Sequence, residues 1–185
     1  MKRMLCVLML ILVLAGCTST SGEMEAALAF RSALLGAQSV TFEARISADY
    51  IDHVEAFTLN CRTDAAGALR FEVAEPEEIR GITGTVVGEE GTLTFDDTIL
   101  AFPLMADDRL SPVSGPWVMM KALRSGYITA CVMEGELLHI TVDDSYADDA
   151  LTLEIWLQGE TVAAAEISWQ GRRQMTMEIE GFSIV

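Results

Sequence analysis

Apolar and polar side chains alternate along the chain from residue 40 to residue 50. The apolar positions are Val40, Phe42, Ala44, Ile46, Ala48 and Tyr50. A period of two predicts a β-strand with one buried face and one solvated face. The same alternation recurs at residues 69–73, 151–157 and 175–179, with further strand-like runs at 54–61, 82–87, 92–95, 98–102, 127–133, 137–142 and 161–169. In the run 54–61 the apolar phase changes, which predicts a β-bulge near Ala56.

Two segments have the character of helices instead. Residues 23–35 are rich in strong helix formers and are followed by Gly36, a typical helix stop. Pro116 suits the first turn of a second helix, which we expect to continue to Arg124 and to end before Gly126.

Consecutive strands joined by tight turns predict an antiparallel meander, because neighbours in sequence usually pair. Most of the strands have a single apolar face, so we expect one large sheet that twists and curls. The predicted fold class is mainly β with two helices (α+β). In this fold a single large curved antiparallel sheet forms an unclosed half β-barrel, and the helices cover it.

Two short helices are narrow compared with an apolar face that widens by about 4.8 Å with each strand. The concave face is therefore expected to keep a partly filled apolar cavity, the usual site for an apolar ligand. The residues expected to line it are Phe42, Ile46, Phe71, Phe95, Trp117, Met120, Met175 and Met177. The alternative is that the methionines fill irregular gaps in a packed core, which their flexible side chains also suit.

The N-terminus predicts export and a lipid anchor. Lys2 and Arg3 precede an apolar run at residues 4–15, shorter than the roughly 20 residues that span a bilayer. Ala15 and Gly16 before Cys17 resemble the bacterial lipobox, whose cysteine is acylated; an ordinary signal peptide is the alternative. We expect a signal peptide at residues 1–16, an acylated Cys17 with a flexible tether at 17–22, and a folded domain at 23–185. Two acyl chains would hold this domain on the extracytoplasmic face of the cell membrane.

The formal net charge of the chain is −16. A surface this acidic repels phosphates, so nucleic acid is not expected as a partner. It also repels anionic headgroups, and a protein partner would more readily be basic.

Candidate chemistry is sparse. Cys61 and Cys131 are the cysteines of the expected mature domain, and an oxidising compartment would allow a disulfide between them; two buried free thiols are the alternative. His53 and His139 lack metal-ligand spacing, so no metal site is expected. The sequence contains no nucleophile elbow, phosphate-binding loop or zinc-protease helix, and we therefore expect neither enzymatic activity nor a cofactor.

Trp156 lies in the polar phase of the run 151–157, next to Glu154 and Gln158 along that face. An exposed aromatic side chain can anchor a partner, which makes Trp156 the candidate for an interaction surface. The alternative is that a helix or loop covers it.

The order of elements over residues 23–185 resembles that of the LolA/LolB superfamily of lipoprotein localisation factors. The segments at residues 76–81, 93–95 and 116–117 are similar to those of lipobox-bearing members from Gram-positive bacteria, such as the spore-germination lipoprotein GerS. The resemblance implies an unclosed β-barrel with a helical lid and the carriage of lipids or lipoproteins between membranes. It also implies that some relatives are docking partners of cell-envelope enzymes.

Two functions are therefore expected from the sequence. The first is a membrane-anchored, non-enzymatic protein whose apolar cavity binds a lipid, an acyl chain or a lipoprotein. The second is a docking or assembly partner of a cell-envelope enzyme or sensor, with its cavity filled by its own side chains.

Overall fold

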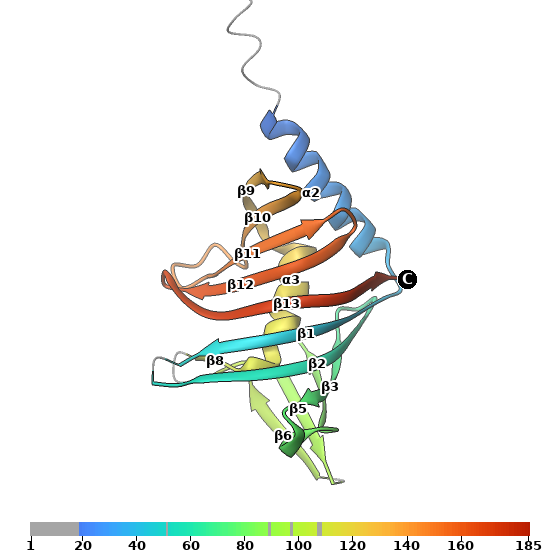
Figure 1. Cartoon of the computed structure of the whole chain (residues 1–185), viewed down its shortest axis with the longest axis vertical. Helices are drawn as coiled ribbons and strands as arrows, with labels where there is room; N and C mark the ends of the chain where they lie inside the picture. Colours follow the sequence, from blue (N-terminus) through green and yellow to red (C-terminus); the bar gives the residue numbers. More distant parts are fainter. Residues whose placement is uncertain (1–18, 51, 89, 97, 107–108) are drawn as a thin grey trace, which may run out of the picture.

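The chain folds around one large antiparallel sheet. A computed structural model describes residues 19–185 except residues 51, 89, 97 and 107–108. Within this range eleven strands pair in the order β6-β5-β4-β3-β2-β1-β13-β12-β11-β10-β9 (Figure 1). The strands are β1 (Ser39–Asp49), β2 (Val54–Asp64), β3 (Leu69–Glu75), β4 (Thr83–Val87), β5 (Glu90–Phe95), β6 (Thr98–Pro103), β9 (Tyr127–Glu134), β10 (Leu137–Asp143), β11 (Leu151–Gln158), β12 (Thr161–Trp169) and β13 (Arg172–Ile184). In the described part of the chain β6 and β9 are the two edges of the sheet, so the predicted open curved sheet with two helices is confirmed.

The sheet consists of two meanders that meet at its centre. Within each meander every strand pairs with its neighbours in sequence, and β1 also pairs with β13, which places Ile46 opposite Met177. The chain passes from edge β6 to edge β9 through the short hairpin β7 (Met105–Ala106) and β8 (Arg109–Leu110), the 3₁₀ turn at Pro112–Ser114, and helix α3 (Gly115–Ser125). This connection carries α3 across the inner face of the sheet (Figure 1).

Helix α3 covers the middle of that inner face. Its buried residues are Gly115, Pro116, Trp117, Val118, Met119, Met120, Ala122 and Leu123. Gly115 lies so close to β13 that a Cβ at this position would be 2.3 Å from Sδ of Met175. Because glycine has no side chain, the start of the helix can rest directly on the strand.

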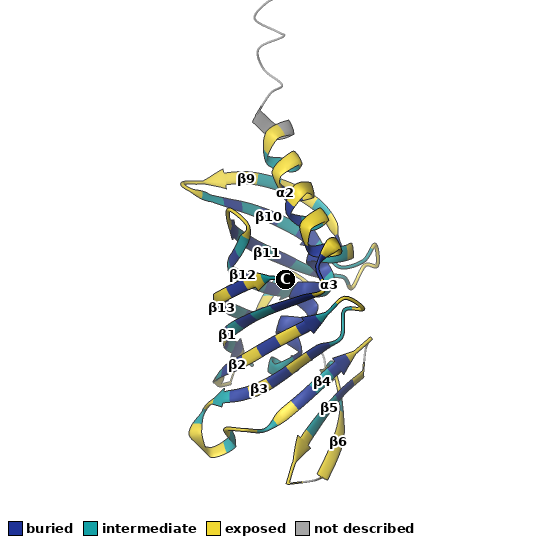
Figure 2. Ribbon diagram, turned by 90° about the vertical axis from the view of Figure 1, so that its right-hand side faces the viewer, coloured by how far each residue is buried: buried dark blue, intermediate teal, exposed yellow. Residues whose placement is uncertain are grey.

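Helix α2 (Ser19–Gly36) packs at the β9 end of the inner face, against β9, β10 and α3 (Figure 2). The residues that it buries along one face are Ala27, Phe30 and Leu34. Arg31 of α2 donates from Nε to the carbonyl oxygen of Leu123 at 2.7 Å and from Nη2 to that of Ala122 at 3.3 Å. The carbonyl group of Ala122 also accepts the backbone N–H of Gly126 at 2.8 Å. Carbonyl groups in the last turn of a helix generally lack partners within the helix, and Arg31 supplies one to Leu123.

Two local expectations are wrong. Helix α2 begins at Ser19, so residues 19–22, expected as a flexible tether, are helical. Extending a formed helix adds one hydrogen bond for each residue that is fixed, which favours such an extension. The bulge lies between Thr58 and Leu59 in the pairing with β3, not near Ala56. Val54 and Ala56 are simply exposed on the outer face, while β2 stays in regular register with β1.

The expected signal peptide (residues 1–16) and Cys17 lie outside the described residues. Among the helices that are described, none combines the length and apolar character needed to cross a bilayer.

Candidate functional site

Most of the side chains expected to line a cavity are instead buried in the core that the helices share with the inner face of the sheet. Those buried in one continuous core with this helix are Phe42, Ile46, Phe71, Met120, Met175 and Met177. The sulfur atoms of Met175 and Met177 lie 2.3 and 3.2 Å from the position that a Cβ of Gly115 would take. The methionines therefore fill the space under the helix, as in the alternative that the sequence left open, because the curled sheet closes tightly around α3.

The inner face is uncovered beyond α3, where β5 and β6 form one end of the sheet. We call this surface the apolar end and define it by the inward-facing residues Leu93, Phe95, Leu100 and Phe102. Phe95 and Leu100 are 61% and 59% exposed, whereas Leu93 and Phe102 are partly buried. The ribbon of β6 is coloured as exposed over nearly its whole length in Figure 2. Of the expected lining residues, Phe95 thus lies on an open surface.

Two glycines let aromatic rings lie close against this part of the sheet. Gly91 is paired with Phe102, and a Cβ at Gly91 would be 2.2 Å from Cζ of that ring. Gly84 is related in the same way to Phe71, with 2.3 Å between the corresponding atoms. The tip of each ring therefore covers a glycine of the neighbouring strand, a position that a larger residue would block.

A cavity of about 340 Å³ opens where β6 ends. Its lining residues are Pro103, Leu104, Met105, Leu110, Trp117, Val118, Lys121, Asp144 and Leu151. The indole N–H of Trp117 donates to the carbonyl oxygen of Gly67 at 3.2 Å, and Nζ of Lys121 lies 5.3 Å from the centroid of the indole ring. A mostly apolar lining with a few polar groups is typical of pockets for small ligands, and the volume lies within their usual range.

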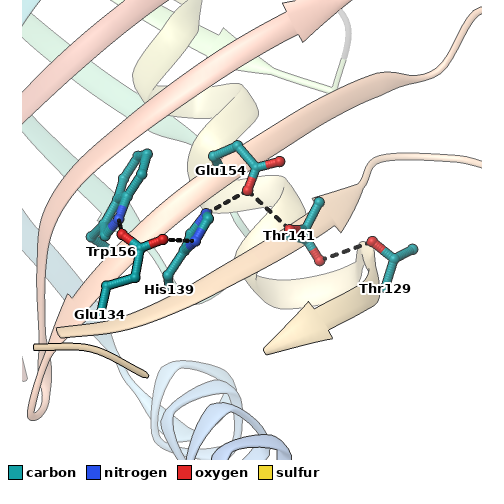
Figure 3. A network of polar contacts seen from close by, with 6 residues as sticks. All are labelled: Thr129, Glu134, His139, Thr141, Glu154 and Trp156. Atoms are coloured by element: carbon teal, nitrogen blue, oxygen red, sulfur yellow. Dashed lines mark hydrogen bonds and ion pairs between the residues drawn. The ribbon is translucent and has the colours of Figure 1, made fainter. Parts of the chain in front are cut away.

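Trp156 lies in a polar network on the outer face of β9, β10 and β11 (Figure 3). Its ring is half-buried and stacks on His139 with centroids 4.6 Å apart and planes inclined by 6°. Its indole N–H donates to Glu134 at 2.9 Å. Since one ring face and the N–H are already engaged within the chain, the use of Trp156 as an interaction anchor remains a prediction.

His139 lies between two carboxylates in this network. Nδ1 is 2.9 Å from Glu134 and Nε2 is 2.5 Å from Glu154, which also accepts a hydrogen bond from Thr141 at 2.9 Å. Both contacts are N–H donations only when the imidazole carries two protons. The pKa of Glu134 is lowered, chiefly by the hydrogen bond from Trp156 and further by His139, against an opposing effect of desolvation. The network thus favours the charged form of Glu134 and joins three strands near the β9 edge.

Cys61 and Cys131 are free thiols, so the disulfide that the sequence left open is not formed. Cys61 is on β2 and Cys131 is on β9, six positions apart in the order of the sheet. At about 4.8 Å per strand this separation far exceeds the Cα distance of about 7 Å that limits a disulfide. Burial raises the pKa of Cys61, and burial with the nearby Glu23 raises that of Cys131 despite the opposing charge of Arg31. Both thiols therefore stay protonated at neutral pH.

Within the described residues, no cluster of three or more His, Cys, Asp or Glu side chains is arranged to hold a metal ion. Leu100, Phe102 and Leu104 contribute to the apolar surface but were not among the residues expected from the sequence to line it. A signal was available, because residues 99–102 are apolar at four consecutive positions and so make both faces of one strand apolar.

No protein-family model matches the chain, and no curated protein matches it. Several solved structures resemble it. A LolA superfamily protein from Nitrosomonas europaea is 8% identical, with 86% of this chain and 93% of that chain covered and a TM-score of 0.45. The lipoprotein LppX from Mycobacterium tuberculosis is 12% identical, with 90% and 96% covered and a TM-score of 0.42. An uncharacterized conserved protein from Thermus thermophilus is 11% identical, with 86% and 87% covered and a TM-score of 0.49. The superfamily that the sequence resembles is thus represented among these structures, whereas the likeness to GerS remains a prediction.

Proposed function

We propose that this protein is a membrane-anchored, extracytoplasmic lipoprotein whose domain binds the acyl chain of a lipid or of another lipoprotein. Export would remove residues 1–16, and Cys17 would carry the anchor. The ligand would lie on the apolar end and enter the cavity at the end of β6. This assigns binding to the part of the inner face that α3 leaves uncovered, not to the core beneath the helix.

The observation that supports this function is the exposure of Phe95 and Leu100 on the inner face of a domain that is otherwise strongly acidic. Contiguous apolar surfaces on soluble domains commonly mark binding sites. Covering the exposed half of each side chain would contribute about 1 kcal/mol, given about 1.5–3 kcal/mol for complete burial.

The cavity adds two features that suit a lipid. Its apolar wall includes Leu104, Val118 and Leu151, and the ammonium group of Lys121 belongs to the same lining. An acyl chain would contact the apolar wall, and the anionic head of a fatty acid would pair with Lys121. Asp144 also lines the cavity, and its carboxylate would oppose an anionic head that bound next to it.

The function is tested by titrating the protein with cis-parinaric acid, a fluorescent fatty acid. Met105→Trp should fill part of the cavity, and Leu100→Ser should remove apolar contact on the inner face of β6. Each change is expected to weaken binding about tenfold, equivalent to about 1.4 kcal/mol.

Matched controls are available on β9, at the opposite edge of the sheet. Met133→Trp and Val132→Ser alter side chains that are also about half exposed, and both variants should bind as the wild type does. The proposal fails if the wild type does not bind the fatty acid, or if the β9 variants weaken binding as much as the variants of the apolar end.

A second candidate function is docking to a cell-envelope protein through edge strand β6. The observation that favours it is Ile99, which lies on the outer side of β6 and is 70% exposed, so this edge is apolar on both faces. Edge strands with free backbone groups are a common site for pairing with a partner chain. Ile99→Lys should abolish retention of a stoichiometric envelope protein and leave fatty-acid binding unchanged. If Ile99→Lys instead retained the envelope protein and lost fatty-acid binding, docking through β6 would be excluded.

A further inference from the structure

Two arginines face each other on the outer surface of the sheet. Arg62 on β2 is directly opposite Arg70 on β3, and both side chains are exposed. Their sequence neighbours Cys61, Leu69 and Phe71 are buried on the inner face, so the arginines lie on the face opposite to α3. Like charges at directly opposite positions of an antiparallel pair are destabilising.

Neither arginine has a partner that offsets this repulsion. Among the Lys and Arg side chains that the structure describes, Arg62 and Arg70 are the ones without a hydrogen bond, an ion pair or a ring contact. The chain contains 28 acidic residues and 12 Lys and Arg residues, so acidic partners are abundant. Two adjacent unpaired guanidinium groups are therefore unexpected on this surface.

The pair lies in a groove of about 800 Å³. Uncharged polar side chains in its lining include Thr41, Asn60, Thr83, Thr85 and Thr94. A neighbouring hollow of about 460 Å³ shares Glu43, Asn60 and Glu72 with it, so the concave region continues along the polar face.

The carboxylates of the groove do not neutralise the arginine pair. Arg45 holds Glu180 through two hydrogen bonds of 2.6 and 3.1 Å and lies 3.5 Å from Glu43. Two of the glutamates in the lining are thereby compensated by a third arginine. Glu72 makes no ion pair with either Arg62 or Arg70 within 4.0 Å, since no such contact occurs in the described residues.

We propose that Arg62 and Arg70 form a binding site for a phosphate group. Each guanidinium offers a planar fork of N–H donors, and a phosphate has enough oxygens to accept both forks, whereas one arginine alone can satisfy a carboxylate. The surrounding acidic domain opposes binding to extended polyanions, which favours a single phosphate group on a small molecule or on one lipid headgroup. The site is on the opposite face from the apolar end, so its test is independent of the proposed acyl-chain binding.

The test measures binding of inorganic phosphate to the full chain, by the ligand-induced rise in the thermal midpoint and by NMR shifts of the arginine Nε–H groups. Arg62→Gln with Arg70→Gln should weaken phosphate binding about tenfold or more, because charge-assisted forked hydrogen bonds are lost. Arg62→Lys with Arg70→Lys should recover only part of the affinity, since lysine keeps the charge without the fork. Arg173→Gln, at an exposed arginine paired with Glu166 on the same sheet, is the matched control and should bind phosphate normally.

Stability without phosphate gives a second readout. The double glutamine variant should be at least as stable as the wild type, because the substitution removes a like-charge pair. A less stable double variant would assign the arginines a structural role and overturn the proposal. So would unchanged phosphate binding in that variant, or an equal loss in Arg173→Gln.

The source of the phosphate group is distinguished with vesicles. Phosphatidylcholine vesicles with phosphatidic acid are compared with phosphatidylcholine vesicles alone. Arginine-dependent binding that requires phosphatidic acid identifies a lipid headgroup, and arginine-dependent binding of inorganic phosphate without such a preference identifies a soluble ligand. Absence of both forms of binding by the wild type refutes the site.

Discussion

Met177→Ala distinguishes a packed core from a ligand cavity beneath α3. Met177 is 1% exposed, lies between Ile46 of β1 and Ala165 of β12 in the sheet, and approaches Gly115 at the start of α3. Truncation removes three heavy atoms from a site that is contacted on both sides and from the helix. If these contacts are a packed core, the variant should lose about 2–5 kcal/mol of unfolding free energy, the range for buried Met→Ala changes.

The size of this loss determines the expected thermal shift. For domains of about 150–250 residues, 1 kcal/mol corresponds to about 2–4 °C, so the midpoint should fall by about 4–20 °C. Met133→Ala is the control: Met133 is half exposed on β9, and substitutions at such surface positions usually change stability by less than about 0.5 kcal/mol.

The assay is urea unfolding of residues 19–185, followed by tryptophan fluorescence and circular dichroism at equal protein concentration. The midpoint should shift without a change in the slope, which reports the surface exposed on unfolding. A loss below about 1 kcal/mol in Met177→Ala would refute tight packing, because removing atoms that line an open or ligand-holding cavity breaks few contacts.

Three further outcomes follow from the geometry. Gly84→Ala should destabilise the domain by about 1–2 kcal/mol in the same urea assay, since overpacking against Phe71 outweighs the gain from replacing a flexible glycine; a more stable variant would contradict the close approach. Cys61 should react with iodoacetamide only after unfolding, as measured by mass spectrometry over time, because burial raises its pKa and hides the thiol; rapid native labelling would exclude this packing. Trp156→Phe should raise the pKa of Glu134, followed by NMR titration of the carboxyl carbon. A carboxyl group with a lowered folded-state pKa contributes stability above its unfolded-state pKa, and this contribution is lost as pH falls. The stabilities of wild type and Trp156→Phe should therefore converge in acid. A stability difference that widens in acid would contradict the role of this hydrogen bond.

The fold class was predictable because alternation is a local property of side chains. The apolar phase from Val40 to Ala48 identifies β1 and its buried face without any tertiary information. The pairing of β1 with β13 joins residues more than 125 positions apart, and no local pattern specifies it.

The exposed apolar surface was harder to predict, because it depends on how far α3 reaches across the sheet. Nothing in the sequence is a reason to treat one part of the concave face differently from another, whereas α3 fills the centre of this face and leaves the β5–β6 end open. The roles of Gly84 and Gly91 appear only once the strand register places an aromatic ring over each of them. The sequence alone likewise does not predict that Arg62 and Arg70 are adjacent, because the two residues become neighbours only through the pairing of β2 with β3.

Helix α2 has a geometric consequence for an anchor at Cys17. The helix starts only two residues later and, at about 1.5 Å per residue, extends for about 27 Å. It begins at one extremity of the long axis of the molecule, and the β5–β6 hairpin lies at the other (Figure 1). A molecule held by such a rigid stalk would present Phe95 and Leu100 to the space beyond its own membrane. Its ligand or partner would then arrive from the far side of that space. The membrane that holds the acyl chains of the anchor would not be the source of the bound lipid.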